Sequence, residues 1–169
     1  EVTVRLYDET HKSLFEDVLT PLGDMAGSQT TTALTQLNGD NSLSPATSPE
    51  ALLQGTVPGL NTLFRSGMEN AGANMFMGGF NSIYNQPLLI IDGMVVENLS
   101  AGISLIDGYL STPMSTIDVK DIERITDLKD AATLYGVKGS NGAIVIETTR
   151  AKDAETRITA QITTGMNLK

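Results

Sequence analysis

The sequence contains no cysteine and only one histidine among its 169 residues. Without cysteine there can be no disulfide, zinc–thiolate site, iron–sulfur cluster or thiol nucleophile, although either a reducing or an oxidising compartment remains possible. The histidine, His11, lies between Thr10 and Lys12 in an irregular stretch and is interpreted as a solvated surface residue. A single imidazole cannot assemble a multi-histidine metal site or leave a spare base for a catalytic triad. We therefore predict no catalytic residue, no metal and no other cofactor.

Positive charge is also scarce. The chain has 11 lysines and arginines against 20 aspartates and glutamates, a formal net charge of -9, and 5% aromatic residues. The cations are scattered singly, whereas nucleic-acid binding needs clustered cations and aromatic stacking platforms. We predict no nucleic-acid partner, and the same charge balance disfavours an anionic membrane surface.

Long apolar runs and targeting signals are missing as well. No uninterrupted run approaches the ~20 apolar residues that a membrane-spanning helix needs. The first residues, EVTVRLYDETHK, have neither the basic start nor the apolar core of a signal peptide, which predicts a mature chain or an excised segment. A chain of 169 residues predicts one domain with some connecting segments, large enough to fold without metal or disulfide.

Short strands and short helices are predicted along the chain, which indicates an α+β domain. The clearest signal is residues 87–96, where two apolar runs flank Asp92-Gly93, a dipeptide suited to a tight hairpin turn. Residues 88–91 are apolar without alternation, which predicts a strand covered on both faces. Further strands are predicted at 30–37 (followed by a turn at 38–41), 61–64, around 75–77, 122–128, 143–149 and, in a separate sheet, 156–164.

Capping residues predict where the helices begin and end. Ser48-Pro49-Glu50 is a typical helix start, and Gly55 ends that helix. Asp118 is predicted to cap a single turn over 119–121. Asp127 or Asp130 is predicted to start a helix at 131–135, which Gly136 ends.

Three groups of residues invite a chemical interpretation. The first group is a set of carboxylates that could form a calcium or general acid/base cluster: Asp118, Asp121 and Glu123, with Asp127 and Asp130. An acid/base cluster of this kind would make the protein an acidic hydrolase, but helix caps and solvated faces explain these residues more simply. The glycines of 135–142 echo a phosphate loop, but they follow a helix and open a strand, the reverse of the required order. The methionines could form a soft-metal or flexible binding surface, although methionine more often fills packing gaps; they are Met68, Met75, Met77 and Met94.

Four ordered motifs are more specific. Residues 50–60 (EALLQGTVPGL) resemble a short helix followed by LxGxVPGL, and residues 86–93 (QPLLIIDG) resemble an xPLxVIDG hairpin. Residues 118–132 (DVKDIERITDLKDAA) are similar to DIExIxVLKDA, and residues 135–149 (YGVKGSNGAIVIETT) to YGxRGANGVIxITT. Together they resemble the plug domain of TonB-dependent outer-membrane receptors, in particular the SusC-like nutrient importers of Bacteroidetes. The resemblance covers about residues 28–150.

This resemblance implies a small mixed β-sheet with short helices and a role without covalent chemistry. The domain would close the lumen of its own β-barrel on the periplasmic side of the outer membrane. It would gate the TonB-coupled import of a nutrient such as a glycan or peptide, beside a SusD-like surface lipoprotein. The implied organisation is a lead-in segment at 1–27, the plug domain at 28–152 and a stub resembling the first barrel strand at 153–169.

Two local features refine this expectation. Where the family has an RIRG motif whose arginines face barrel carboxylates, this chain has Met75-Phe76-Met77-Gly78, which argues against a charge-based contact there. Asn81, Tyr84 and Asn85 are candidates for polar substrate contact because amides and a phenol suit hydroxyl-rich ligands, while a structural loop against the barrel wall is the alternative. The alternative for the whole chain is a free-standing periplasmic ligand-binding or signalling module with a plug-like fold.

Overall fold

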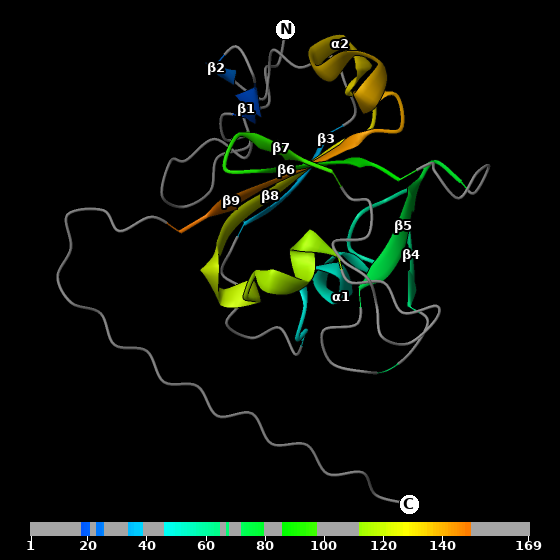
Figure 1. The fold of residues 1–169 in the computed structure, drawn as a ribbon, viewed down its shortest axis with the longest axis vertical. Helices are drawn as coiled ribbons and strands as arrows, with labels where there is room; N and C mark the ends of the chain where they lie inside the picture. The colour runs from blue at the N-terminus through cyan, green and yellow to red at the C-terminus, as the bar shows by residue number, and fades with distance from the viewer. Residues whose placement is uncertain are drawn as a thin grey trace, which may run out of the picture.

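A five-stranded mixed sheet forms the centre of the molecule (Figure 1), in the order β3-β8-β9-β6-β7. A computed structural model of the chain describes residues 18–20, 23–25, 34–38, 46–64, 67, 72–79, 86–97 and 112–149. Strand β6 runs parallel to β9, and the other neighbouring pairs of the sheet are antiparallel. The predicted α+β class with a small mixed sheet is confirmed. The strands are β3 (Leu34–Asn38), β6 (Leu88–Ile91), β7 (Met94–Val96), β8 (Ile122–Leu128) and β9 (Ala143–Thr148).

Within the residues that the structure describes, two further hairpins and five short helices accompany this sheet. In Figure 1, α1 and the hairpin β4–β5 lie on one side of the sheet, and α2 lies on the other. The hairpins are β1 (Val18–Thr20) with β2 (Gly23–Met25), and β4 (Leu60–Phe64) with β5 (Ala73–Met77). The α-helices are α1 (Pro49–Leu53) and α2 (Ala132–Tyr135), and the 3₁₀ helices are η3 (Pro113–Thr116), η4 (Val119–Asp121) and η5 (Gly136–Gly139).

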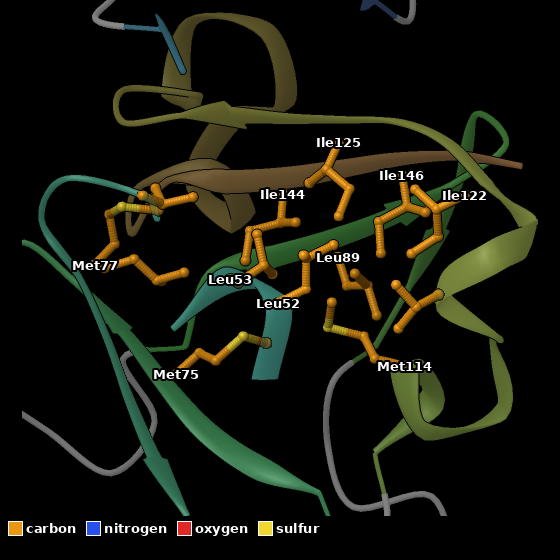
Figure 2. Packing of buried hydrophobic residues seen from close by; sticks show 13 residues of the cluster. Leu52, Leu53, Met75, Met77, Leu89, Met114, Ile122, Ile125, Ile144 and Ile146 are labelled. Atoms are coloured by element: carbon orange, nitrogen blue, oxygen red, sulfur yellow. The ribbon is translucent and has the colours of Figure 1, made fainter. Parts of the chain in front are cut away.

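The sheet buries side chains on both faces. The larger core lies between the sheet, α1, β5 and η3 (Figure 2); ten of its residues are labelled there, namely Leu52, Leu53, Met75, Met77, Leu89, Met114, Ile122, Ile125, Ile144 and Ile146. The smaller core lies under α2 and contains Leu88, Ile90, Leu128, Ala131, Ala143 and Val145. Strand β6 contributes to both cores, so the prediction that it is covered on both faces is confirmed.

The hairpin β6–β7 has the predicted turn. Asp92 and Gly93 have φ angles of 48° and 82°, the positive values that a type I′ turn needs at both central positions. Glycine adopts such an angle freely, and aspartate is among the few other residues that tolerate it. This local rule placed the end of β6 correctly from sequence.

Two of the three predicted helix starts are confirmed. The Ser48 hydroxyl accepts a hydrogen bond from the Ala51 amide at 3.3 Å, with Pro49 in the first turn. The Asp118 carboxylate accepts from the Lys120 amide at 3.0 Å and caps η4. The third start is wrong, because neither predicted aspartate caps α2: its cap position is Ala131, without a side-chain hydrogen bond.

Several boundaries differ from the predictions. The strand expected at 30–37 is described from Leu34 and continues through Asn38, which pairs with Arg124 although a turn was predicted there. The predicted lead-in contains the hairpin β1–β2, which its sequence pattern did not indicate. The strand expected at 156–164 and the stub at 153–169 lie outside the described residues.

Candidate functional site

The three predicted substrate-contact residues, Asn81, Tyr84 and Asn85, lie outside the described residues, but the segment that carries them begins and ends at described positions. The described chain stops at Gly79, after β5 has ended at Met77, and resumes at Gln86, before β6 begins at Leu88. The Gln86 side-chain amide donates to Oδ1 of Asn74 on β5 at 3.3 Å. Asn74 is itself buried, at 7% exposure, so this hydrogen bond holds Gln86 against the β4–β5 hairpin.

The turn at residues 57–60 contacts the chain directly after β5, next to the start of the candidate segment. The Gly78 amide, directly after β5, donates to the Gly59 carbonyl at 2.9 Å, and β4 begins at Leu60. Residues from the first quoted motif and from the MFMG sequence therefore share one junction. The structure brings together the entry to the candidate segment and this turn.

A second junction joins the Asp92 turn to the end of β9. The Asp92 carboxylate accepts from the Thr148 amide at 2.9 Å and from the Thr148 hydroxyl at 2.7 Å, while the Asp92 amide donates to the Ile146 carbonyl at 2.9 Å. The Thr149 amide donates to the Asp121 carbonyl at 2.7 Å. Three of the quoted motifs thus meet where the chain leaves the central sheet.

This junction yields a stability prediction. Replacing Asp92 by alanine removes both acceptors and leaves a residue that disfavours positive φ, so the free energy of unfolding should fall by about 2 kcal/mol. Asp92→Asn keeps one acceptor and tolerates the turn, so the loss should be about 1 kcal/mol. Urea unfolding of both variants measures the difference; equal losses would mean that the second carboxylate oxygen, which asparagine lacks, holds the junction and that the turn angle contributes little.

Two carboxylates are buried instead of solvated. Glu50 is 0% exposed, and one of its oxygens accepts a hydrogen bond from the Thr112 hydroxyl, which joins α1 to η3. Asp127 is 1% exposed, and neither of its oxygens has a hydrogen-bond partner. Burial raises the pKa of Asp127 from 3.8 to about 6, partly opposed by the Lys129 cation.

The family model of the TonB-dependent Receptor Plug Domain matches residues 25–143. The chain belongs to this family. The match runs from the end of β2 to the first residue of β9, so it includes the first junction, both buried carboxylates, and Asp92 and Asp121 of the second junction.

Named relatives agree with this assignment. The chain is similar to the TonB-dependent receptor SusC of Bacteroides thetaiotaomicron, with 29% identity over 160 residues, 92% of this chain and 15% of SusC. It is also similar to the rhizobactin receptor of Rhizobium meliloti, with 34% identity over 80 residues, 47% of this chain and 10% of that receptor. The chain therefore spans a small part of the length of these relatives.

Solved structures share the fold. The RagAB peptide importer in its open-open state matches 83% of this chain and 15% of its own chain, with a TM-score of 0.60 and 24% identity. A second structure, of the RagAB peptide transporter, matches 75% of this chain and 13% of its own chain at a TM-score of 0.55 and 28% identity. The siderophore receptor PirA from Acinetobacter baumannii matches 70% of this chain and 17% of its own chain, with a TM-score of 0.52 and 19% identity.

The family assignment places the plug domain at the outer membrane, in a family of receptors and transporters rather than a class of enzymes. Of the helices that the structure describes, none has the length and apolar character to cross a bilayer.

The predicted acidic cluster is not assembled as one site. Asp118 caps η4 and Asp127 is buried in β8, whereas Asp121, Glu123 and Asp130 are exposed. In the described segments, no three histidine, aspartate or glutamate side chains gather as metal ligands. The carboxylates are explained by capping and solvated faces together with one buried position.

Two glycines of the 135–142 stretch, Gly139 and Gly142, lie where an added Cβ would crowd its neighbours. Helix α2 ends at Gly136, η5 follows, and β9 begins at Ala143, so the order is helix, turn and strand. A Cβ on Gly139 would lie 2.6 Å from the Ala131 carbonyl oxygen. The predicted helix end is confirmed, and the order differs from that of a phosphate loop.

The methionines divide between core and surface. Met75 and Met77 are buried in the larger core, at 0% and 8% exposure, whereas Met94 on β7 is 68% exposed. Met68 lies outside the described residues. At the place of the RIRG motif, this chain therefore has apolar packing within the plug domain.

Sequence reasoning missed the burial of Asp127. The family pattern DIExIxVLKDA has valine where this chain has Asp127, and an apolar residue at that position signals a core-facing strand position. The contact between Gln86 and Asn74 has no local sequence signal, because Asn74 lies in β5 and Gln86 lies just before β6, twelve residues further along the chain.

Proposed function

We propose that the chain is the plug of an energy-coupled outer-membrane importer. It closes the lumen of its own β-barrel on the periplasmic side, and it moves when TonB acts on the receptor. It performs no catalysis. The observation that supports this function best is the family match over 25–143, which contains four of the five strands of the central sheet and the first residue of β9.

The proposed cargo is a nutrient such as a glycan or a peptide, delivered beside a SusD-like surface lipoprotein. Similarity to SusC over 92% of the chain supports the SusC-like branch of the family. The RagAB structures are titled as a peptide importer or transporter, which supports a peptide as one of the two cargo classes.

Fractionation of native cells tests the proposal. An antibody raised against the 169-residue chain should detect, in the outer membrane, a protein far larger than the 18.0 kDa of this chain. A soluble species near 18.0 kDa would contradict the proposal and fit the free-standing periplasmic module instead.

The segment anchored at Gln86 supplies a functional test. We infer that Asn81, Tyr84 and Asn85 contact the cargo, since amide and phenol groups can donate and accept hydrogen bonds. Replacing all three by alanine in the full receptor should raise the cargo concentration for half-maximal uptake about tenfold, as expected for the loss of one or two net hydrogen bonds.

Asn61→Ala is the matched control, because Asn61 is an exposed amide on β4. Both variants must reach the outer membrane in equal amounts on the immunoblot. Unchanged uptake affinity in the triple variant would assign the segment to packing against the barrel wall.

A further inference from the structure

Asp127 occupies an unusual position in the central sheet. Its carboxylate is 1% exposed, and neither oxygen has a hydrogen-bond partner. A buried carboxylate of this kind is disfavoured in its charged form, because it has lost water without gaining a donor. The group must either hold a proton or regain contact with water.

The surroundings show where water can reach it. Asp127 lies two residues from Ile125 on β8, so its side chain shares the face of the larger core. Opposite it stand Ile144 on β9 and Thr35 on β3. Strand β3 ends the sheet, and it is therefore the strand whose release exposes Asp127 without breaking the centre of the sheet.

Few charges face Asp127 from the neighbouring strands. Lys129, two residues after Asp127, favours the ionised form of the Asp127 carboxyl, but the effect of burial on the pKa is larger. Strands β3, β4 and β5 contain no titratable side chain. Strand β9 has one, Glu147, whose place in the strand puts it on the opposite face, where it pairs with Arg124.

The helices that pack on this face add no cation near the group. Helix α1 carries Glu50, which is bonded to Thr112, and η3 has no titratable side chain. Helix η4 has Lys120 and Asp121, and both are exposed. Among the described elements, Lys129 is thus the one charge acting on Asp127 that shifts its titration.

We propose that Asp127 makes β3 a proton-sensitive edge strand, paired with β8 while the carboxyl is protonated and released more readily once it is ionised and hydrated. The raised pKa of about 6 agrees with this geometry, and it places the change between pH 3.8 and about pH 6. Strand β3 is short and its side chains at 34–37 are half-buried, so the free energy that holds it to β8 is small enough for one buried, unhydrated charge to cancel. The inference concerns the fold of this chain and does not depend on its cargo.

Amide hydrogen exchange of the 169-residue chain tests the proposal, with protection corrected for the intrinsic pH dependence of exchange. Protection of the β3 amides should fall at least about tenfold between about pH 4.5 and about pH 7.5. The amides of β6, on the other side of the sheet, should keep theirs. In Asp127→Asn, which cannot ionise, β3 protection should not change with pH.

Two comparisons keep the test decisive. Asp127→Val replaces the group by an apolar side chain and must also remove the pH dependence; Asp121→Asn removes an exposed carboxylate and must retain it. The proposal is overturned if wild-type β3 protection does not depend on pH, if Asp127→Asn shows the same fall, or if β6 loses protection to the same extent as β3.

Discussion

Asp127→Asn should raise the free energy of unfolding of the 169-residue chain by about 3 kcal/mol near pH 7. In the folded chain, burial raises the pKa of this carboxyl from 3.8 to about 6. Each pKa unit corresponds to about 1.4 kcal/mol, so a shift of about two units accounts for the expected gain. An uncharged amide of the same shape avoids the penalty of an ionised, unpartnered group.

The sign of the pH dependence follows from proton binding. The folded state holds the Asp127 proton more tightly than the unfolded state, so this group lowers stability progressively as pH rises from 3.8 to about 6. Above about pH 6 the full penalty remains. Urea unfolding from about pH 4 to about pH 8 should therefore show a difference between variant and wild type that grows from under about 1 kcal/mol to about 3 kcal/mol.

The difference between variant and wild type isolates the contribution of Asp127 from that of the rest of the chain. Asp121→Asn is the control, since this exposed carboxylate should give a difference near zero at every pH. If Asp127→Asn were less stable than wild type at neutral pH, the charged form of Asp127 would have to be stabilised in the fold, contrary to its lack of a hydrogen-bond donor.

Local rules predicted much of the fold. The Asp92-Gly93 turn, the Ser48 cap and the Asp118 cap each depend on neighbours within a few residues, and all three are confirmed. The apolar pattern of 88–91 also predicted a strand covered on both faces. Such features need no knowledge of distant segments.

The missed features depend on contacts between distant parts of the chain. The strand at 122–128, which includes Asp127, is predicted correctly, but Asp127 is also one of two candidate caps for the next helix; the structure instead buries it in β8, where Ile144 and Thr35 pair with it from both sides. The contact of Gln86 with Asn74 and that of Asp92 with Thr148 likewise join separate segments. The candidate contacts Asn81, Tyr84 and Asn85 stay predictions from residue chemistry.

Gly139→Ala should destabilise the chain by about 3 kcal/mol, the upper end of the usual range for overpacking. An added Cβ would lie 2.6 Å from the carbonyl oxygen and 2.8 Å from the carbonyl carbon of Ala131. Both are backbone atoms of a fully buried residue in the smaller core, so they cannot move aside as a flexible side chain would. Either η5 or the start of α2 must shift.

Gly136→Ala separates this steric effect from the conformational effect of losing a glycine. Gly136 has a φ of +64° and a ψ of −150°, a region that essentially only glycine adopts, and open space around its Cβ position, so alanine there should cost about 2 kcal/mol through backbone strain alone. Gly139 has no positive φ, and its substitution therefore tests packing alone. Thermal and urea unfolding should rank Gly139→Ala as clearly less stable than Gly136→Ala. The reverse order would mean that η5 yields easily, and that the motif's glycines serve backbone conformation rather than the close approach of η5 to Ala131.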